Sequence, residues 1–88
     1  MDLEYANMKL EELIEYTQKN NANEIHSYYH NKLVQLKRDL NEDTVDNDLF
    51  ELLKELGSYM NATVFQDTKL AHVMCELMMI RAVITFRD

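Results

Sequence analysis

Apolar residues recur every three or four positions through most of the chain, which is the period of an α-helix and not of a β-strand. The first such run contains Met8, Leu10, Leu13 and Ile14 and ends near residue 20. The chain has no proline and a single glycine, so it lacks the residues on which β-hairpin turns usually depend. The pattern therefore predicts an all-α fold whose first helix ends close to residue 20.

A second helix is predicted from Asn21, whose side chain can cap it while Glu24, three residues later, reaches back to a free backbone N–H. Lys37 and Arg38 fall in its last turn, where cations interact favourably with the negative end of the helix dipole. Residues 41–44 then connect it to the next helix. Its apolar positions form one narrow stripe: Ile25, Tyr29, Leu33, Leu36 and Leu40.

The third predicted helix has Asp46 and Asp48 in or near its first turn, which is again the favourable sign for the helix dipole. Gly57 suits the position just after the end of this helix, because glycine adopts the left-handed conformation at little cost. The pattern leaves residues 58–62 open as either a turn or a kinked continuation. The apolar stripe of this helix is Val45, Leu49, Leu52, Leu53 and Leu56.

The last helix is predicted from Thr63, which with Gln66 matches a Thr-x-x-Gln capping box, to Phe86, a length of about 35 Å. Apolar side chains occur all around it, and a helix of this kind is normally buried. Three amphipathic helices cover only roughly two-thirds of its circumference, so we expect a methionine-rich remainder that forms a homo-oligomer interface. The residues expected there are Leu70, Val73, Met74, Leu77, Met78, Ile80 and Ile84.

With 88 residues, the chain is expected to fold as one helical domain, residues 1–88, a small bundle of about four helices completed by oligomerisation. Cys75 is the single cysteine and lies among apolar residues, which predicts a buried thiol and no disulfide within the chain. Met1 is followed by Asp2 and Glu4, which is unlike a signal peptide, and charges interrupt every long apolar stretch. We therefore expect a cytoplasmic protein that does not enter a membrane.

Sixteen acidic and nine basic residues give the chain a formal net charge of −7. This charge argues against direct binding to a nucleic-acid backbone, because a positive field supplies most of the affinity there. It is compatible with a basic protein partner, or with nothing more than a soluble surface. Residues 39–55 contain seven acidic residues and one basic residue, Lys54. If this segment faces solvent, it is suited to steering a basic partner toward the protein.

His26 and His30 are four residues apart, the spacing that places two imidazoles over one metal ion on a helix. The zinc protease motif has glutamate directly after the first histidine, where this chain has Ser27. A third ligand would have to come from elsewhere, with His72 and Glu76 as candidates. We therefore expect no metal ion and no other cofactor.

Glu11, Glu12 and Glu15 form a Glu-Glu-x-x-Glu pattern, and Asp43 and Asp46 follow as Asp-x-x-Asp. This layout resembles that of the all-α nucleotide pyrophosphohydrolases of the MazG type, in which two carboxylate clusters on neighbouring helices hold Mg²⁺ over a triphosphate. The chain departs from that pattern because the second cluster there begins with glutamate, and the aspartates here lie at a helix start. The resemblance implies a metal-dependent hydrolase as one alternative, against an ordinary solvated acidic helix surface.

Four residues are candidates for binding. Tyr28 and Lys32 place an aromatic ring and a cation together on the second helix, and tyrosine is a good interface anchor that can also stack on a base. Glu76 and Arg81 are charges inside the apolar last helix. Each is costly to bury alone, so each is expected to have a partner across a helix–helix or subunit interface.

These features favour a non-catalytic binding protein over an enzyme. We expect a small helical protein that inhibits or sequesters a partner, of the kind found among immunity proteins, toxin inhibitors and phage proteins directed against a host or its defences. One alternative is an oligomeric sponge for a small anionic ligand such as a nucleotide or cyclic dinucleotide, and the other is the hydrolase. The expected partners are copies of the chain itself, with either a basic host protein or a small anion.

Overall fold

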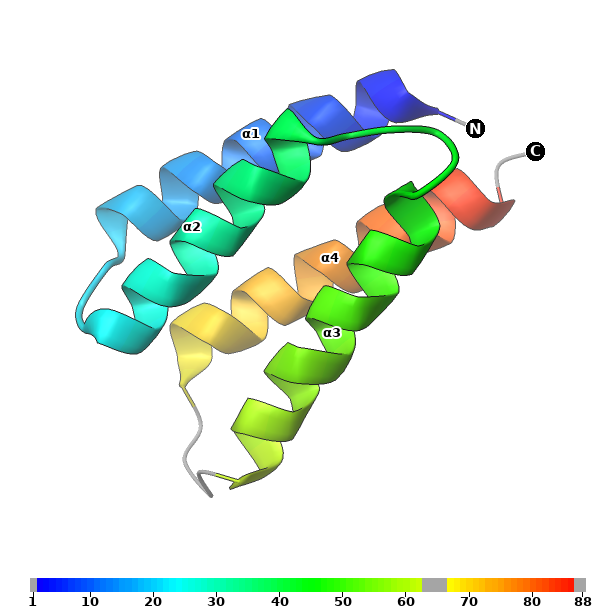
Figure 1. Cartoon of the computed structure of the whole chain (residues 1–88). Coiled ribbons are helices and arrows are strands. Elements are labelled where there is room, and N and C mark those ends of the chain that lie inside the picture. The colour runs from blue at the N-terminus through cyan, green and yellow to red at the C-terminus, as the bar shows by residue number, and fades with distance from the viewer. Residues whose placement is uncertain (1, 63–66, 87–88) are drawn as a thin grey trace.

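The computed structural model describes residues 2–62 and 67–86. Within these residues the chain forms helices and no strands (Figure 1). The helices are α1 (Leu3–Lys19), α2 (Glu24–Arg38), α3 (Val45–Ala62) and α4 (Thr68–Phe86). Successive helices reverse direction, as Figure 1 shows. The prediction of an all-α bundle of about four helices is confirmed.

Side chains satisfy backbone N–H groups at the starts of α1, α2 and α4. Asp2 accepts a hydrogen bond of 2.9 Å from the backbone N–H of Tyr5, and Asn23 accepts one of 2.9 Å from that of His26. Asp67 accepts two backbone N–H groups in the first turn of α4, each at 3.2 Å. These carboxylate and amide oxygens replace the partners that the first turn of a helix lacks.

Two helix starts differ from the prediction. Asn23 and not Asn21 caps α2, and the Asn21 side chain accepts a hydrogen bond of 3.0 Å from the hydroxyl of Ser27 instead. The capping box predicted over residues 63–66 lies outside the described residues. Because α4 begins at Thr68, it has 19 residues, five fewer than the 24 predicted from Thr63.

Gly57 does not end α3. The helix continues through it to Ala62, so residues 58–62, left open by the sequence, are helical. Tyr59 and Met60 are half-buried and pack against the core. Their burial outweighs the preference against glycine inside a helix, which is about 1 kcal/mol.

The helices pack unevenly around one core. α1 packs along both α2 and α4, and α3 packs along α4, whereas α2 and α3 have few contacts with each other. The stripe of α2 differs from the prediction at its first position, where His26 is 5% exposed and Ile25 is 38% exposed. Among the residues that the structure describes, fifteen apolar ones are buried: Ala6, Leu10, Leu13, Tyr29, Leu33, Leu36, Val45, Leu49, Leu52, Leu56, Leu70, Val73, Leu77, Ile80 and Ile84.

The last helix has one buried side and one exposed side. Its buried positions, Leu70, Val73, Leu77, Ile80 and Ile84, belong to the core of the same chain. In this fold they are therefore not available to a second copy, although the sequence placed them in an oligomer interface. Of the other two residues predicted there, Met74 is half-buried and Met78 is exposed.

Cys75 is exposed and not buried as predicted, because it lies on the open side of α4. Among the described residues, no helix is long and apolar enough to cross a membrane.

Candidate functional site

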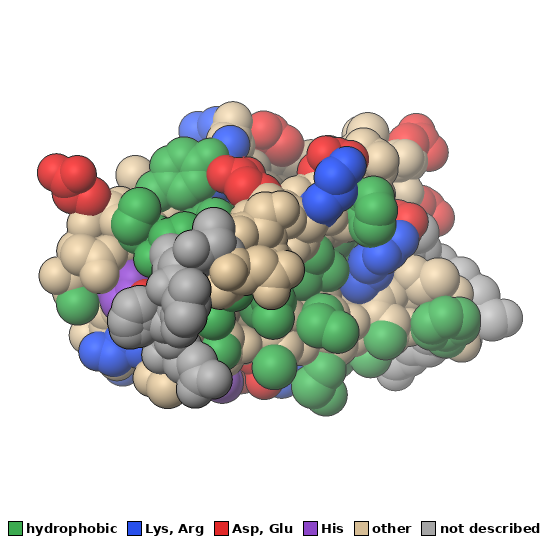
Figure 2. Space-filling model, turned by 90° about the horizontal axis from the view of Figure 1, so that it is seen from below, with side chains coloured by type: hydrophobic (Ala, Val, Ile, Leu, Met, Phe, Trp, Pro, Cys, Tyr) green, Lys and Arg blue, Asp and Glu red, His purple; other side chains and the backbone are tan. Residues whose placement is uncertain are grey.

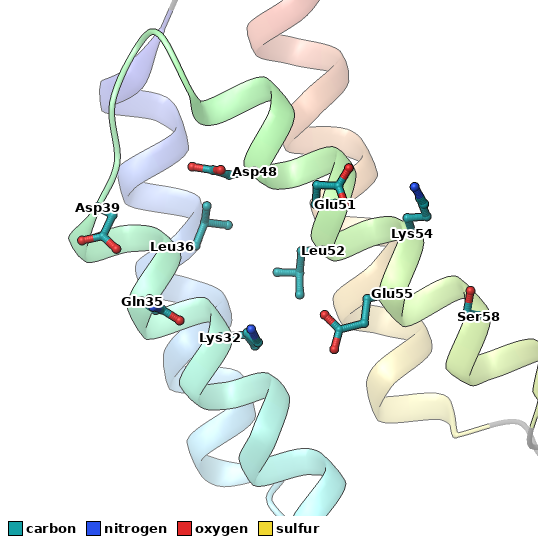
Figure 3. A pocket seen from close by; sticks show the side chains of 10 residues that line it. All are labelled: Lys32, Gln35, Leu36, Asp39, Asp48, Glu51, Leu52, Lys54, Glu55 and Ser58. Atoms are coloured by element: carbon teal, nitrogen blue, oxygen red, sulfur yellow. The ribbon is translucent and has the colours of Figure 1, made fainter.

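A groove of about 440 Å³ lies between α2 and α3, where these two helices diverge (Figure 3). Leu36 from α2 and Leu52 from α3 form its apolar floor, and Figure 3 shows the two side chains pointing toward each other. They are 8% and 7% exposed, so each belongs to the core and also borders the groove. The full lining is Lys32, Gln35, Leu36, Asp39, Asp48, Glu51, Leu52, Lys54, Glu55 and Ser58.

Acidic side chains dominate the rim of this groove. Asp39 is the cap residue directly after α2, and three carboxylates come from α3. Those of α3 are Asp48, Glu51 and Glu55, at spacings of three and four, which place them on one side of a helix. With Lys32 and Lys54 as the only cations in the lining, the groove has two more acidic than basic groups. The acidic segment 39–55 therefore supplies all four carboxylates of the lining.

Tyr28 lies beside the groove and links its two walls. Its hydroxyl donates a hydrogen bond to Glu55 of α3, and this bond raises the pKa of the phenol above its ordinary value. The ammonium of Lys32 is 5.4 Å from the centre of the Tyr28 ring, a cation–π distance. Tyr28 and Lys32, both predicted as binding residues, are thus brought together at this groove.

Arg81 lies elsewhere, between α3 and α4. Its Nε donates to Asp46 Oδ1 at 2.7 Å, Nη2 lies 3.4 Å from Asp46 Oδ2, and the guanidinium carbon is 4.9 Å from the centre of the Phe50 ring. The hydrogen bond from Arg81 is the main cause that lowers the pKa of Asp46. Arg81 therefore has the helix–helix partner that the sequence required, but it is not part of the groove.

Glu76 is half-buried on α4, and its charge contributes to raising the pKa of Lys9 on α1. The larger cause of that increase is the hydrogen bond from Lys9 to Glu12. Glu76 is therefore part of the charged surface between α1 and α4. The four predicted binding residues do not form one site.

The two histidines proposed as a metal-binding pair are used within the fold. His26 Nε2 lies 2.6 Å from Asp67 Oδ2, and its Nδ1 accepts the backbone N–H of Ala22 at 3.1 Å. Because Nδ1 accepts, Nε2 is the nitrogen that donates to Asp67. His30 Nδ1 lies 2.7 Å from the hydroxyl of Thr17 on α1. In residues 2–62 and 67–86, no group of three or more histidine, cysteine or acidic side chains is placed to hold a metal ion.

The carboxylates of the Glu-Glu-x-x-Glu pattern are all in ion pairs within the chain. Glu11 pairs with Lys37 at 3.3 Å, while Glu12 and Glu15 pair with lysines of α1 itself at 3.2 and 3.0 Å. In the second pattern, Asp46 pairs with Arg81, and Asp43 is exposed in the turn before α3. Within the described part of the chain, the two patterns do not come together as a group of three or more side chains that could hold a metal ion.

The groove itself is the feature that the sequence did not reveal. Leu36 and Leu52 have the spacing of ordinary core positions, and nothing in that spacing says that α2 and α3 diverge. The one available signal was the row of Asp48, Glu51 and Glu55, which flanks Leu52 on the same helix. Charged residues flank the buried stripe of any amphipathic surface helix, so this row alone does not distinguish a groove from an ordinary solvated face.

Comparison of the chain with protein-family models, with curated proteins and with solved structures found no match. The geometry and the charge of the groove are therefore the basis for assigning a function.

Proposed function

We propose that the protein is a non-catalytic binding protein that sequesters or inhibits its partner by holding a cationic amphipathic segment in the groove between α2 and α3. The observation that carries this proposal is the combination of a leucine floor with four carboxylates on the rim. An apolar side chain of the partner packs on Leu36 and Leu52, and lysine or arginine side chains beside it pair with Asp39, Asp48 and Glu51.

Helical segments are the natural occupants of such a groove. An amphipathic helix commonly binds by placing its apolar face between two helices of its target. The groove runs between two such helices, its volume is within the usual range for binding pockets, and its floor is already apolar. The rim carboxylates favour a basic partner and also raise its rate of association, in a chain whose net charge is already −7.

The same charges disfavour the anionic ligand considered above. Lys32 and Lys54 share the groove with four carboxylates, and Arg81 is held by Asp46 on another side of the bundle. A nucleotide phosphate in the groove would meet more negative than positive charge. The geometry therefore supports a basic protein segment over a nucleotide.

A fluorescent amphipathic peptide of leucine and lysine tests this proposal, with a leucine–glutamate peptide of the same pattern as the control. Fluorescence anisotropy should show binding of the lysine peptide and none of the glutamate peptide. Glu51→Lys reverses one rim charge and should weaken binding by at least about tenfold. The matched control is Glu12→Lys, which makes the same change of charge on the exposed surface of α1.

Equal losses of peptide affinity in the two variants would mean that only the net charge matters. This result would contradict binding in the groove. Circular dichroism of both variants checks that they are folded. The rim carboxylates are exposed or half-exposed, so Glu51→Lys should leave the helical spectrum unchanged.

A further inference from the structure

The outer side of α4 is a largely apolar surface of the bundle. None of the exposed residues between Thr68 and Phe86 is Asp, Glu, Lys or Arg. The charged residues within this range, Lys69, Glu76 and Arg81, are half-buried at its sides. The exposed residues of α4 are Thr68, His72, Cys75, Met78, Met79, Ala82, Thr85 and Phe86.

Figure 2 shows how charged and hydrophobic side chains are distributed on one face of the molecule. Charged side chains gather in its upper half, and a band of hydrophobic side chains crosses its lower half between the two grey segments. A hollow of about 290 Å³ lies between α3 and α4, lined by Leu53, Met78, Arg81, Ala82, Thr85 and Phe86. Exposed apolar patches with polar residues at their edges are common features of interaction sites.

Charge identifies the occupant of this face. Each copy of the chain has a net charge of −7, so two copies repel wherever acidic surfaces meet. Exposed charged residues occur on α1, α2 and α3, for example Glu15, Arg38 and Glu51. The outer side of α4 is a helix face on which two copies can meet without bringing exposed like charges into contact. A second copy therefore fits it better than a charged partner does.

The order of residues along this face is also self-complementary. If two copies of α4 run antiparallel around a two-fold axis between residues 78 and 79, Met78 of one copy lies beside Met79 of the other. The same axis places Cys75 beside Ala82, two small residues that allow the helices to approach closely, and Phe86 beside Ala71. In a two-fold interface every such contact occurs twice, once in each direction.

We propose that the exposed face of α4 is the interface of a symmetric antiparallel homodimer. Met79 of each copy then lies at the hollow between α3 and α4 of the other copy. α4 packs mainly against α1 and α3, so its outer side is turned away from the groove between α2 and α3. The dimer leaves both grooves open, and the proposal does not depend on what the grooves bind.

A cysteine cross-link tests the geometry of this dimer. Ala82→Cys introduces a second thiol seven residues after Cys75 on the same helix, about 10.5 Å away along the axis. This separation is too large for a disulfide within one chain, since the Cα atoms of a disulfide are usually less than about 7 Å apart. Mild oxidation should therefore give covalent dimers that join Cys75 of one copy to the new cysteine of the other, with most of the protein in dimers on non-reducing gels.

Two control proteins separate the position of a cysteine from the number of cysteines. Cys75→Ala with Ala82→Cys keeps a single thiol, and its two copies lie about 10 Å apart across the two-fold axis, so it should not cross-link. Asn31→Cys adds an exposed thiol on α2 while Cys75 remains. Cross-linking that is no greater for Ala82→Cys than for Asn31→Cys would overturn the proposal. Cross-linking of the unchanged protein through Cys75 alone would indicate parallel helices and would also overturn it.

A charge placed at the centre of the face gives an independent test in the reduced protein. Met78 is 55% exposed on α4, and Met8 is 51% exposed on α1, so Met8→Lys is a matched control for Met78→Lys. By sedimentation equilibrium, the unchanged protein and Met8→Lys should have twice the chain mass of 10.5 kDa. Met78→Lys should weaken self-association by at least about tenfold with an unchanged helical spectrum. A monomeric unchanged protein, or equal association of the two variants, would contradict the dimer.

Discussion

The groove between α2 and α3 and the outer face of α4 both offer apolar side chains to solvent, but they differ in the charges around them. Leu36 and Leu52 lie between four carboxylates and two lysines, whereas Met78 and Met79 have no exposed charged neighbour on their helix. A charged rim selects an unlike partner of opposite sign, and an uncharged face allows a like-charged copy to approach. With the function and the dimer proposed above, one small bundle would use two surfaces for two different kinds of partner.

The two surfaces also differ in how they arise from the packing. The groove exists because α2 and α3 diverge, so that the edge of the core is left open. The face of α4 exists because the helix has apolar residues on all sides, and its neighbours cover only the side with Leu70 and Leu77. The first is a gap in the packing, and the second is apolar surface in excess of what the bundle can bury.

The largest expected effect separates the closed part of the core from the floor of the groove. Leu77→Ala removes a side chain that is 0% exposed and should lower the free energy of unfolding by about 3–5 kcal/mol. Leu52→Ala should cost only about half as much, because the space that it leaves opens into the groove and fills with water. Urea denaturation followed by circular dichroism at one protein concentration measures both. Equal costs would show that α2 and α3 close over Leu52 in solution.

Salt should act in opposite directions on the two surfaces. Raising the salt concentration from 0.1 M to 1 M shortens the screening length from about 10 Å to about 3 Å. Binding of the leucine–lysine peptide should weaken by about tenfold, because it depends on the rim carboxylates. Self-association through α4 should stay constant or strengthen, since screening reduces the repulsion between two copies. Fluorescence anisotropy and sedimentation equilibrium at both salt concentrations measure these changes. If high salt weakened peptide binding and self-association alike, the two surfaces would not differ in their dependence on charge.

The smallest effect concerns the contacts that hold α4 in the position that exposes its outer face. Burial is the largest influence on Asp67 and raises its pKa, but the hydrogen bonds from His26 and from the backbone N–H groups of Leu70 and Lys69 lower it below the ordinary value near 3.8. The folded state therefore binds a proton less strongly than the unfolded state. The resulting stability is present above about pH 4 and is lost as the pH falls through the lower pKa of the folded state.

Asp67→Asn keeps a residue that can cap α4 and removes the charge beside His26. It should cost about 1 kcal/mol at pH 7 and flatten the loss of stability below pH 4. Urea denaturation between pH 7 and pH 2 measures this profile. Asp46→Asn is the comparison, since the Asp46 carboxylate is more exposed and its pair with Arg81 is more strongly screened. If the stability of Asp67→Asn fell more steeply with acid than that of the unchanged protein, this would contradict the lowered pKa of Asp67 as the source of the acid dependence.

Several features of the fold could be predicted from residues close together in the sequence. The helical periods, and Lys37 and Arg38 in the last turn of α2, are local properties and are found as expected. The connection predicted at residues 41–44 begins two residues earlier, directly after Arg38. The need of Arg81 for a partner was predictable, because a charge inside an apolar helix is costly to leave alone. Its partner Asp46 lies 35 residues away, and only the packing of α3 on α4 brings the two together.

Two errors in the prediction have the same cause. Ile25 is apolar and His26 is polar, so a stripe through Ile25 is the natural choice from sequence. The fold buries His26 instead, because Asp67, 41 residues later, and the backbone of Ala22 satisfy both of its ring nitrogens. Gly57 lies inside α3 because Tyr59 and Met60, beyond it, find places against the core. In each case a distant contact outweighs a local preference.

The sequence by itself determined that the chain is helical, acidic and richer in apolar surface on its last helix than a bundle of this size can cover. These three properties follow from the types of residue and their spacing along the chain, so they do not depend on how the helices are arranged. Only the tertiary structure decided which side of α4 is buried, that α2 and α3 part around Leu36 and Leu52, and that the acidic segment lines the resulting groove. The physical reason is that a helix apolar on all sides has no preferred direction until its neighbours are in place.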